Sequence, residues 1–106
     1  TNPTRRYAGA ADLIQRALAL SPGDPAILDS LGWVYYKLGQ YSESEALLRE
    51  AHNAFPDPEV AAHLGEVLWI QGRQIEARDV WRDGLSRVPD HPIILEAVER
   101  LGAELP

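Results

Sequence analysis

Three histidines, His52, His63 and His91, are the side chains of this 106-residue chain best suited to act as a general base or metal ligand. Imidazole titrates near neutral pH and binds many metals. A zinc-binding helix would carry two histidines four residues apart, but none of these three stands so close to another, and the chain has no cysteine. We therefore predict no metal, no cofactor and no catalytic residue, with His63 alone left open as a candidate base.

Carboxylate pairs are the other arrangement that could support acid and base chemistry. Glu43 and Glu45 are two residues apart, which on a helix places them on different faces. Asp79 and Asp83 alternate with arginines, a pattern typical of a solvated helix face. The chain also lacks a glycine-rich phosphate loop, a nucleophile elbow and a calcium loop. We therefore expect this protein not to be an enzyme.

The charge balance argues against nucleic acid as a partner. The net charge is −6, and the basic residues are Lys37 and nine arginines. Phosphate binding needs a positive face, which this composition does not supply. No apolar run approaches the roughly 20 residues of a membrane span, so we expect no direct membrane insertion by this segment. Without cysteine there are no disulfides, which leaves the compartment open.

Three prolines reveal an internal repeat. Pro22, Pro56 and Pro89 lie 34 and then 33 residues apart, and the residues around them recur in register. Each unit reads as two helices with apolar periodicity, joined at a glycine and ended by the proline. The predicted helices span residues 7–20, 25–38, 42–54, 58–71, 74–87 and 92–102. The spacing therefore predicts an all-α fold of antiparallel helix pairs.

Local signals refine these helices. Asp24 and Asp57 each precede a proline, so each can supply an N-cap oxygen to a helix that begins with proline. Gly32 and Gly65 fall inside predicted helices, where glycine costs about 1 kcal/mol relative to alanine. We expect a second helix to approach closely at both glycines, because a methyl group would collide there.

The repeated pattern resembles that of the tetratricopeptide repeat family, W-x2-L-G-x2-Y…A-x3-F…P. The first full copy supplies Leu28, Leu31, Gly32, Tyr35, Ser44, Leu48 and Pro56. The second supplies Ala61, Leu64, Gly65, Leu68, Ala77, Trp81 and Pro89. Trp81 stands at the place of the family's buried Phe, so the resemblance implies that it is buried in the core. The departures, among them Ser44 for the family's Ala, exchange one packing residue for another. The resemblance implies an α-solenoid of about two and a half repeats plus a C-terminal capping helix.

We interpret residues 1–106 as a single domain taken from a longer array. Residues 7–20 match a second helix without its first helix, residues 25–56 and 58–89 form complete repeats, and residues 92–103 form the capping helix. An unpaired second helix leaves its apolar stripe partly uncovered, because a repeat cannot bury its face alone. The chain is therefore also expected to form homo-oligomers through this N-terminal helix.

The resemblance implies that the first helices line a concave groove for a peptide or protein partner. Trp33, Tyr36 and Trp69 lie off the predicted packing stripe, so they are candidate anchors for an apolar side chain. Asp29, Glu59 and Glu66 would add a negative rim. In the capping helix, we expect Ile94 and Leu95 to face the other helices and Ala97 to lie on the groove side, where it would help to close one end. The expected groove residues are Asp29, Ser30, Trp33, Tyr36, Lys37, Ala62, His63, Glu66 and Trp69. Alternatively, Tyr36 and Trp69 pack between adjacent first helices.

The function expected from this reading is a non-catalytic scaffold or adaptor. Residues 24–38, 59–69 and 80–85 are similar to C-terminal repeats of proteobacterial cell-envelope lipoproteins of this family. That resemblance implies an adaptor that delivers substrates, including cell-wall hydrolases, to a carboxyl-terminal processing protease. It also implies a bacterial periplasmic location, with the parent protein anchored to the outer membrane; a cytoplasmic location is the alternative. The competing hypothesis is a structural self-association module.

Overall fold

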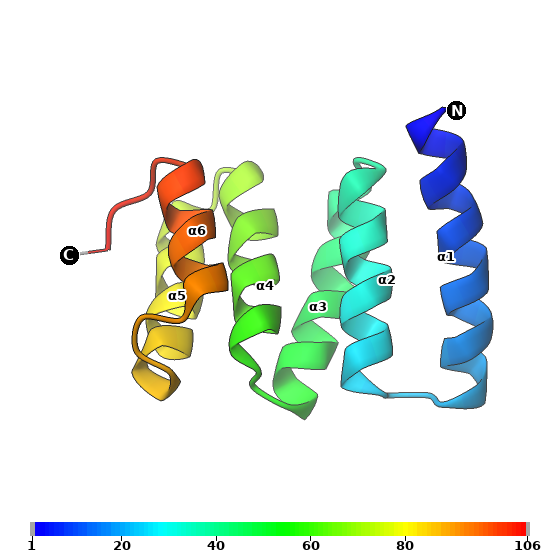
Figure 1. The fold of residues 1–106 in the computed structure, drawn as a ribbon, viewed down its shortest axis with the longest axis horizontal. Coiled ribbons are helices and arrows are strands. Elements are labelled where there is room, and N and C mark those ends of the chain that lie inside the picture. Colours follow the sequence, from blue (N-terminus) through cyan, green and yellow to red (C-terminus); the bar gives the residue numbers. More distant parts are fainter. Residues whose placement is uncertain (1, 106) are drawn as a thin grey trace. The chain divides into compact units, whose positions relative to one another are not determined.

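The computed structural model describes residues 2–105 and forms, within them, six α-helices and no strand (Figure 1). The all-α prediction is confirmed. The helices are α1 Pro3–Leu20, α2 Pro25–Lys37, α3 Tyr41–Ala54, α4 Pro58–Ile70, α5 Gln74–Arg87 and α6 Pro92–Arg100. None of these helices combines the length and the apolar character needed to cross a membrane.

Side-chain caps followed by proline begin four of the helices. The Asp24 carboxylate accepts a hydrogen bond from the Ala26 N–H at 2.9 Å, and Asp57 caps α4 in the same way. Both predicted caps are confirmed. α1 begins at Pro3, four residues before the predicted start, because Asn2 accepts from the Thr4 N–H at 2.9 Å. Asn2 and Pro3 are the same type of start signal as Asp24 and Pro25, and the sequence prediction overlooked them.

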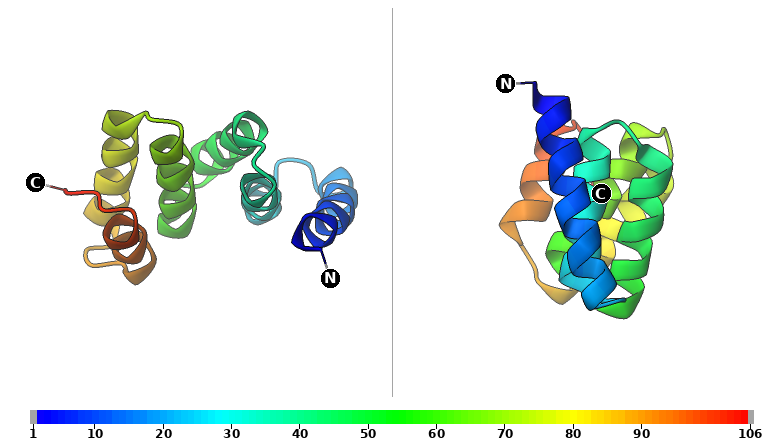
Figure 2. Two further views of the ribbon diagram at one scale, coloured as in Figure 1. Left: turned by 90° about the horizontal axis from the view of Figure 1, so that it is seen from above. Right: turned by 90° about the vertical axis from the view of Figure 1, so that its right-hand side faces the viewer.

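The chain divides into two compact units, Thr1–Phe55 and Pro56–Pro106. In the first unit, α2 packs against both α1 and α3 (Figure 2). In the second unit, α4 pairs with α5, and α6 packs against both of them (Figure 2). Consecutive helices within each unit run antiparallel (Figure 1). Glycines in the left-handed region, Gly39 with φ 79° and Gly72 with φ 83°, turn the chain within the two complete pairs.

A glycine at each helix crossing allows the paired helices to approach closely. A Cβ at Gly32 would lie 2.8 Å from Leu48 Cγ, and a Cβ at Gly65 would lie 2.1 Å from Trp81 Nε1. Leu48 and Trp81 are both fully buried. The predictions of close approach at the two glycines and of a buried Trp81 are therefore confirmed. The Trp81 indole N–H donates to the Ala62 carbonyl at 3.3 Å, which satisfies its polar group in the core.

The apolar stripe of α1 is less covered than the matching stripes of α3 and α5. Ala10, Ile14 and Ala17 are half-buried. The matching residues in the two complete pairs are all buried: Ser44, Leu48, Ala51, Ala77, Trp81 and Gly84. Leu13 and Leu20 on α1 are 66% and 89% exposed. The first unit thus presents an apolar surface on α1.

The last helix turns a different face to its neighbours than expected. Ile94 is buried, as predicted, and would touch a Cβ placed at Gly84. Leu95, expected to face the other helices, is 39% exposed, whereas Ala97, expected on the groove side, is buried. Ile94, Ala97 and Leu101 share one side of a helix with a period of 3.6 residues, and Leu95 falls outside it. The prediction for Leu95 and Ala97 was wrong.

Candidate functional site

Three aromatic side chains of the first unit form a continuous cluster. The rings of Trp33 and Tyr36 stack with centroids 4.8 Å apart and planes at 24°. The ring centroid of Tyr41, at the start of α3, lies 5.6 Å from that of Tyr36. The Lys37 ammonium lies 5.1 Å from the Trp33 ring centroid and 5.8 Å from that of Tyr36. We call Trp33, Tyr36 and Tyr41 the aromatic cluster.

The aromatic cluster is only partly shielded from solvent. Trp33 and Tyr36 are half-buried, and Tyr41 is 37% exposed. Stacked rings bury part of each other's faces and leave their remaining surface for contact. A cation over the ring face adds a favourable interaction of about 0.5–1 kcal/mol at exposed sites. The cluster therefore offers a preformed apolar contact surface with one positive charge beside it.

The other two expected groove residues of α2 contribute less. Ser30 is exposed, but its hydroxyl donates to the Ala26 carbonyl of the same helix at 2.9 Å. Asp29 is half-buried. Of the five residues expected on this helix, the structure brings Trp33, Tyr36 and Lys37 into one contact surface. Sequence reasoning missed Tyr41, because it restricted the groove to first helices and Tyr41 begins a second helix.

In the second unit, two of the expected groove residues are buried. Ala62 is 1% exposed and Glu66 is 4% exposed. Glu66 accepts hydrogen bonds from both terminal nitrogens of Arg100, at 2.6 and 3.2 Å. Arg100 also donates to Glu96 at 2.7 Å. The expectation that Ala62 and Glu66 line a binding surface was therefore wrong, and so was the contribution of Glu66 to a negative rim.

The Glu66–Arg100 ion pair links α4 to α6. Hydrogen bonds from Arg100 to Glu66, and then to Glu96, raise the pKa of the Arg100 guanidinium above its ordinary value. The two carboxylates thus favour the charged form of the guanidinium. A charged partner is what a buried carboxylate requires, because burial without one is costly. The pair acts as a structural link and not as a recognition site.

Trp69 packs within its own helix pair. Its ring centroid lies 5.8 Å from that of Trp81, and the Arg78 guanidinium carbon lies 5.2 Å above the ring. Trp69 and His63 are both half-buried. Within residues 2–105, no three His, Asp or Glu side chains gather as metal ligands. The four groove residues expected on α4 thus do not form a single exposed surface.

Antiparallel helix pairs that cross at a small residue, repeated along an all-α chain, define the class of α-solenoid repeat proteins. A tetratricopeptide repeat family model matches residues 4–67, and a second tetratricopeptide repeat model matches residues 58–83. The chain belongs to the tetratricopeptide repeat family. Repeats of this family serve as scaffolds for protein–protein interaction.

Individual relatives are similar to parts of this chain. The TPR repeat-containing protein PA4667 of Pseudomonas aeruginosa is 54% identical over 63 residues, which are 59% of this chain and 11% of that protein. The protein O-mannosyl-transferase TMTC1 of Mus musculus is 35% identical over 100 residues, which are 87% of this chain and 10% of that protein. The chain thus spans about a tenth of either relative.

A solved structure named MamA MSR-1 C2 has a similar fold. Its TM-score is 0.69 at 26% identity, and the match covers 92% of this chain and 59% of that one. A structure named MamA D159K mutant 1 matches with a TM-score of 0.65. These similarities confirm the α-solenoid class of the fold and agree with a role as a protein interaction scaffold.

Proposed function

We propose that this chain is a non-catalytic adaptor module that binds an apolar segment of a partner protein through the aromatic cluster of its first unit. The observation that carries the proposal is the stack of Trp33 on Tyr36, 4.8 Å apart, with Lys37 over both rings. Tryptophan and tyrosine are enriched among the residues that dominate binding energy in protein interfaces.

The chemistry of the cluster favours an apolar side chain flanked by neutral or acidic groups. The rings supply apolar area at a low cost in conformational entropy, because each is already held by its neighbours. Lys37 is exposed beside the rings and disfavours a cationic partner group. This differs from the sequence-based expectation of a negative rim, because Glu66 is committed to Arg100.

The histidines support the non-catalytic part of the proposal. The His91 ring nitrogen Nδ1 accepts from the Ile93 N–H at 3.3 Å, so this histidine serves as the cap of α6. His52 lies on α3 and His63 on α4, in different units. The transferase named among the relatives is a much longer protein, of which this chain spans 10%.

The finer proposal is that the parent protein works in the bacterial cell envelope. Such an adaptor would deliver substrates, cell-wall hydrolases among them, to a carboxyl-terminal processing protease in the periplasm, with the parent anchored to the outer membrane. The 54% identity to a protein of Pseudomonas aeruginosa supports a bacterial origin. The protease and the compartment rest on the resemblance to envelope lipoproteins.

Affinity capture with the full-length parent protein tests the proposal. Trp33→Ala removes the largest ring of the aromatic cluster, and we expect it to reduce capture of the specific partner at least about tenfold. Phe55→Ala is the matched control, because Phe55 is an aromatic residue of the same unit that is 60% exposed and lies outside the cluster. The captured proteins are identified by mass spectrometry, and direct binding is then measured with the purified partner.

Two results separate the coarse proposal from the finer one. If Trp33→Ala and Phe55→Ala retain the same proteins in the same amounts, the cluster is not the binding surface. If capture depends on Trp33 but the lost proteins include neither a protease nor its substrates, the adaptor role stands and the protease assignment fails.

Self-association is the second candidate function, favoured by the exposed leucines of α1. Leu13 and Leu20 are seven residues apart, and they are 66% and 89% exposed. Two copies of this surface could cover each other, as in a symmetric dimer interface. Light scattering of the isolated chain tests this function, because a dimer would double the measured mass and a monomer would exclude self-association.

A further inference from the structure

A second surface lies on α5, in the unit that contains the Glu66–Arg100 ion pair. Two neighbouring pockets of about 310 and 350 Å³ share Ile75 and Arg78 in their linings. We propose that this continuous depression, here named the α5 surface, binds an extended peptide that places an acidic side chain between Arg78 and Arg82 and an apolar side chain against Ile75. The surface shares no residue with the aromatic cluster.

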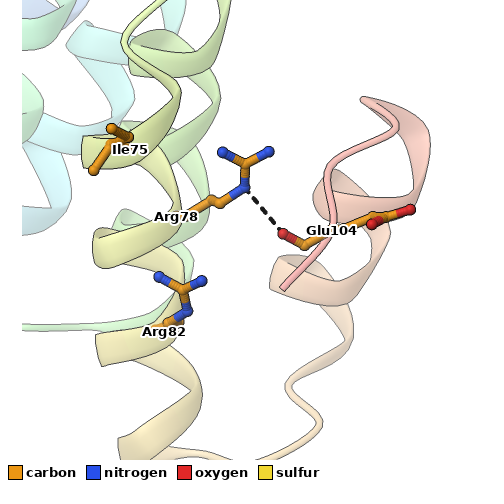
Figure 3. Close-up of a pocket in the computed structure, with 4 residues that line it drawn as sticks. All are labelled: Ile75, Arg78, Arg82 and Glu104. Carbon is orange, nitrogen blue, oxygen red and sulfur yellow. Dashed lines mark hydrogen bonds between the residues drawn. The ribbon is translucent and has the colours of Figure 1, made fainter. Parts of the chain in front are cut away.

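The spacing of the three residues places them on one face of the helix. Ile75, Arg78 and Arg82 stand at positions i, i+3 and i+7 of α5, and all three line the first pocket (Figure 3). Ile75 is 76% exposed. An apolar side chain thus lies beside two guanidinium groups, which is the combination that a mixed apolar and acidic segment requires.

Arg78 is held in position by two other parts of the unit. Its Nε–H donates to the Glu104 carbonyl oxygen at 3.0 Å (Figure 3), and its guanidinium lies over the Trp69 ring, 5.2 Å from the centroid. Among residues 2–105, neither of its terminal nitrogens has a hydrogen-bond acceptor. A guanidinium that is already ordered loses less conformational entropy when it binds a carboxylate in bidentate geometry.

Arg82 supplies a second cation that can exchange its partner. Its contact with Asp79 is long, at 3.4 Å, and both side chains are well exposed, at 43% and 68%. Exposed pairs of this kind are worth little, so an incoming carboxylate can replace Asp79 at small cost. The Glu104 carboxylate points away from Arg78 (Figure 3), which leaves the pocket open to an external acidic group.

The surrounding charges favour a single carboxylate over a polyanion. Asp79 and Glu76 lie on the same helix, and the chain carries a net charge of −6. A phosphate backbone would meet this repulsion along its whole length, whereas one carboxylate meets mainly the two arginines. The second pocket continues the depression past Arg78 to Arg73 and Gly72. A bound segment can therefore run through the surface, which favours an internal acidic side chain over a terminal carboxylate.

Peptide titration followed by amide NMR of the 15N-labelled 106-residue chain tests the proposal. The probe is an acetylated and amidated peptide, Leu-Glu-Leu-Glu-Leu, and the comparison peptide replaces both glutamates with glutamine. We expect the glutamate peptide to shift the amide signals around Ile75, Arg78 and Arg82, and to bind at least about fivefold more tightly than the glutamine peptide. Raising the salt concentration should weaken binding.

Variants locate the binding surface. Arg82→Gln and Ile75→Ser should each weaken binding of the glutamate peptide by about threefold to tenfold. Arg87→Gln is the matched control, because Arg87 is an exposed arginine of the same helix that pairs with Asp83 at 3.3 Å and lies outside both pockets. Arg87→Gln should leave the affinity unchanged. Arg82 is a better test than Arg78, because Arg78 also packs on Trp69.

Four outcomes would overturn the inference. The first two are equal affinity for the glutamate and glutamine peptides, and equal losses of affinity from Arg82→Gln and Arg87→Gln. The other two are the same amide shifts from inorganic phosphate at equal concentration, and tighter binding of a leucine peptide whose only carboxylate is its C-terminus. Trp33→Ala should not change this titration. Failure of the α5 surface is therefore distinguishable from failure of the aromatic cluster.

Discussion

The two complete helix pairs use equivalent positions for different purposes. Trp33 of α2 and Glu66 of α4 stand 33 residues apart at the same place in the repeat. Trp33 stacks on Tyr36 in a half-buried aromatic cluster, whereas Glu66 is buried and bound by Arg100 of α6. In the second unit, α6 packs against α4 and supplies the Arg100 that binds Glu66. A position in the repeat therefore does not by itself identify a binding residue.

The residue opposite each glycine accounts for a second difference. Leu48 faces Gly32 in the first pair, and Trp81 faces Gly65 in the second. The larger Trp81 gives Trp69 an aromatic neighbour, with centroids 5.8 Å apart. Tyr36, at the place that matches Trp69, stacks instead on Trp33. The residue at this core position thus differs between the two pairs, and so does the ring partner of the matching aromatic residue.

The largest expected effect comes from Gly65→Ala. The new methyl group would fall within 2.1–2.6 Å of three atoms of the rigid, fully buried Trp81 ring. We expect the free energy of unfolding to fall by about 3 kcal/mol. Gly32→Ala should cost less, about 1 kcal/mol, because its closest contact, Leu48 Cγ at 2.8 Å, is longer than the contacts with the Trp81 ring. Urea unfolding followed by circular dichroism measures both variants.

A double variant checks the cause of the Gly65 effect. Trp81→Leu makes the second pair resemble the first, so it should recover at least about 1 kcal/mol of the loss caused by Gly65→Ala. If the double variant loses as much unfolding free energy as the two single variants together, the proposed clash between residue 65 and Trp81 is contradicted. The residue opposite the glycine would then not explain a difference between the two helix pairs.

The next largest effect should come from Arg100→Gln. This change leaves the Glu66 carboxylate buried without its charged partner, which we expect to lower the free energy of unfolding by about 2 kcal/mol. Glu66→Gln should cost less, about 1 kcal/mol, because the amide oxygen can still accept from Arg100. The exposed pair of Arg87 with Asp83 provides the control, and Arg87→Gln should change stability by less than about 0.5 kcal/mol. Equal losses of unfolding free energy in Arg100→Gln and Arg87→Gln would show that the ion pair with Arg100 of α6 does not stabilise the buried Glu66.

The smallest effect on stability is expected for the exposed stripe of α1. Leu13→Gln together with Leu20→Gln should change the free energy of unfolding by less than about 0.5 kcal/mol, because both side chains are largely exposed. If α1 mediates self-association, the same double variant should convert a dimer to a monomer in light scattering. A monomeric wild-type chain at high concentration would remove the self-association hypothesis and leave partner binding.

Much of the fold could be predicted from local signals. Asp24 and Asp57 specify helix starts through hydrogen bonds to nearby backbone N–H groups, and these contacts require no distant residue. The same signal at Asn2 was present but overlooked. The internal repeat also located the close helix crossings, because Gly32 and Gly65 recur in register.

The candidate sites were less predictable. The expected groove combined residues that the structure distributes over an aromatic cluster, an ion pair and a buried core. Trp33, Tyr36 and Lys37 come together, but Ala62 and Glu66 are covered. Periodicity indicates which residues share a face of one helix, but it does not indicate which neighbour packs on that face. Arg78 was interpreted as part of a solvated surface, and its contact with Glu104 was not anticipated.

The sequence by itself determined the repeat, the helix pairs, the capped helix starts and the tight glycine crossings, because each depends on contacts within a few residues or on recurrence along the chain. The tertiary structure alone decided that Glu66 pairs with Arg100, 34 residues away, and that Arg78 meets the Glu104 carbonyl, 26 residues away. These contacts depend on how α6 and the segment after it pack against α4 and α5. The helical period determines on which side of its own helix a residue lies. Which residue it contacts there depends on how a second helix packs against that side.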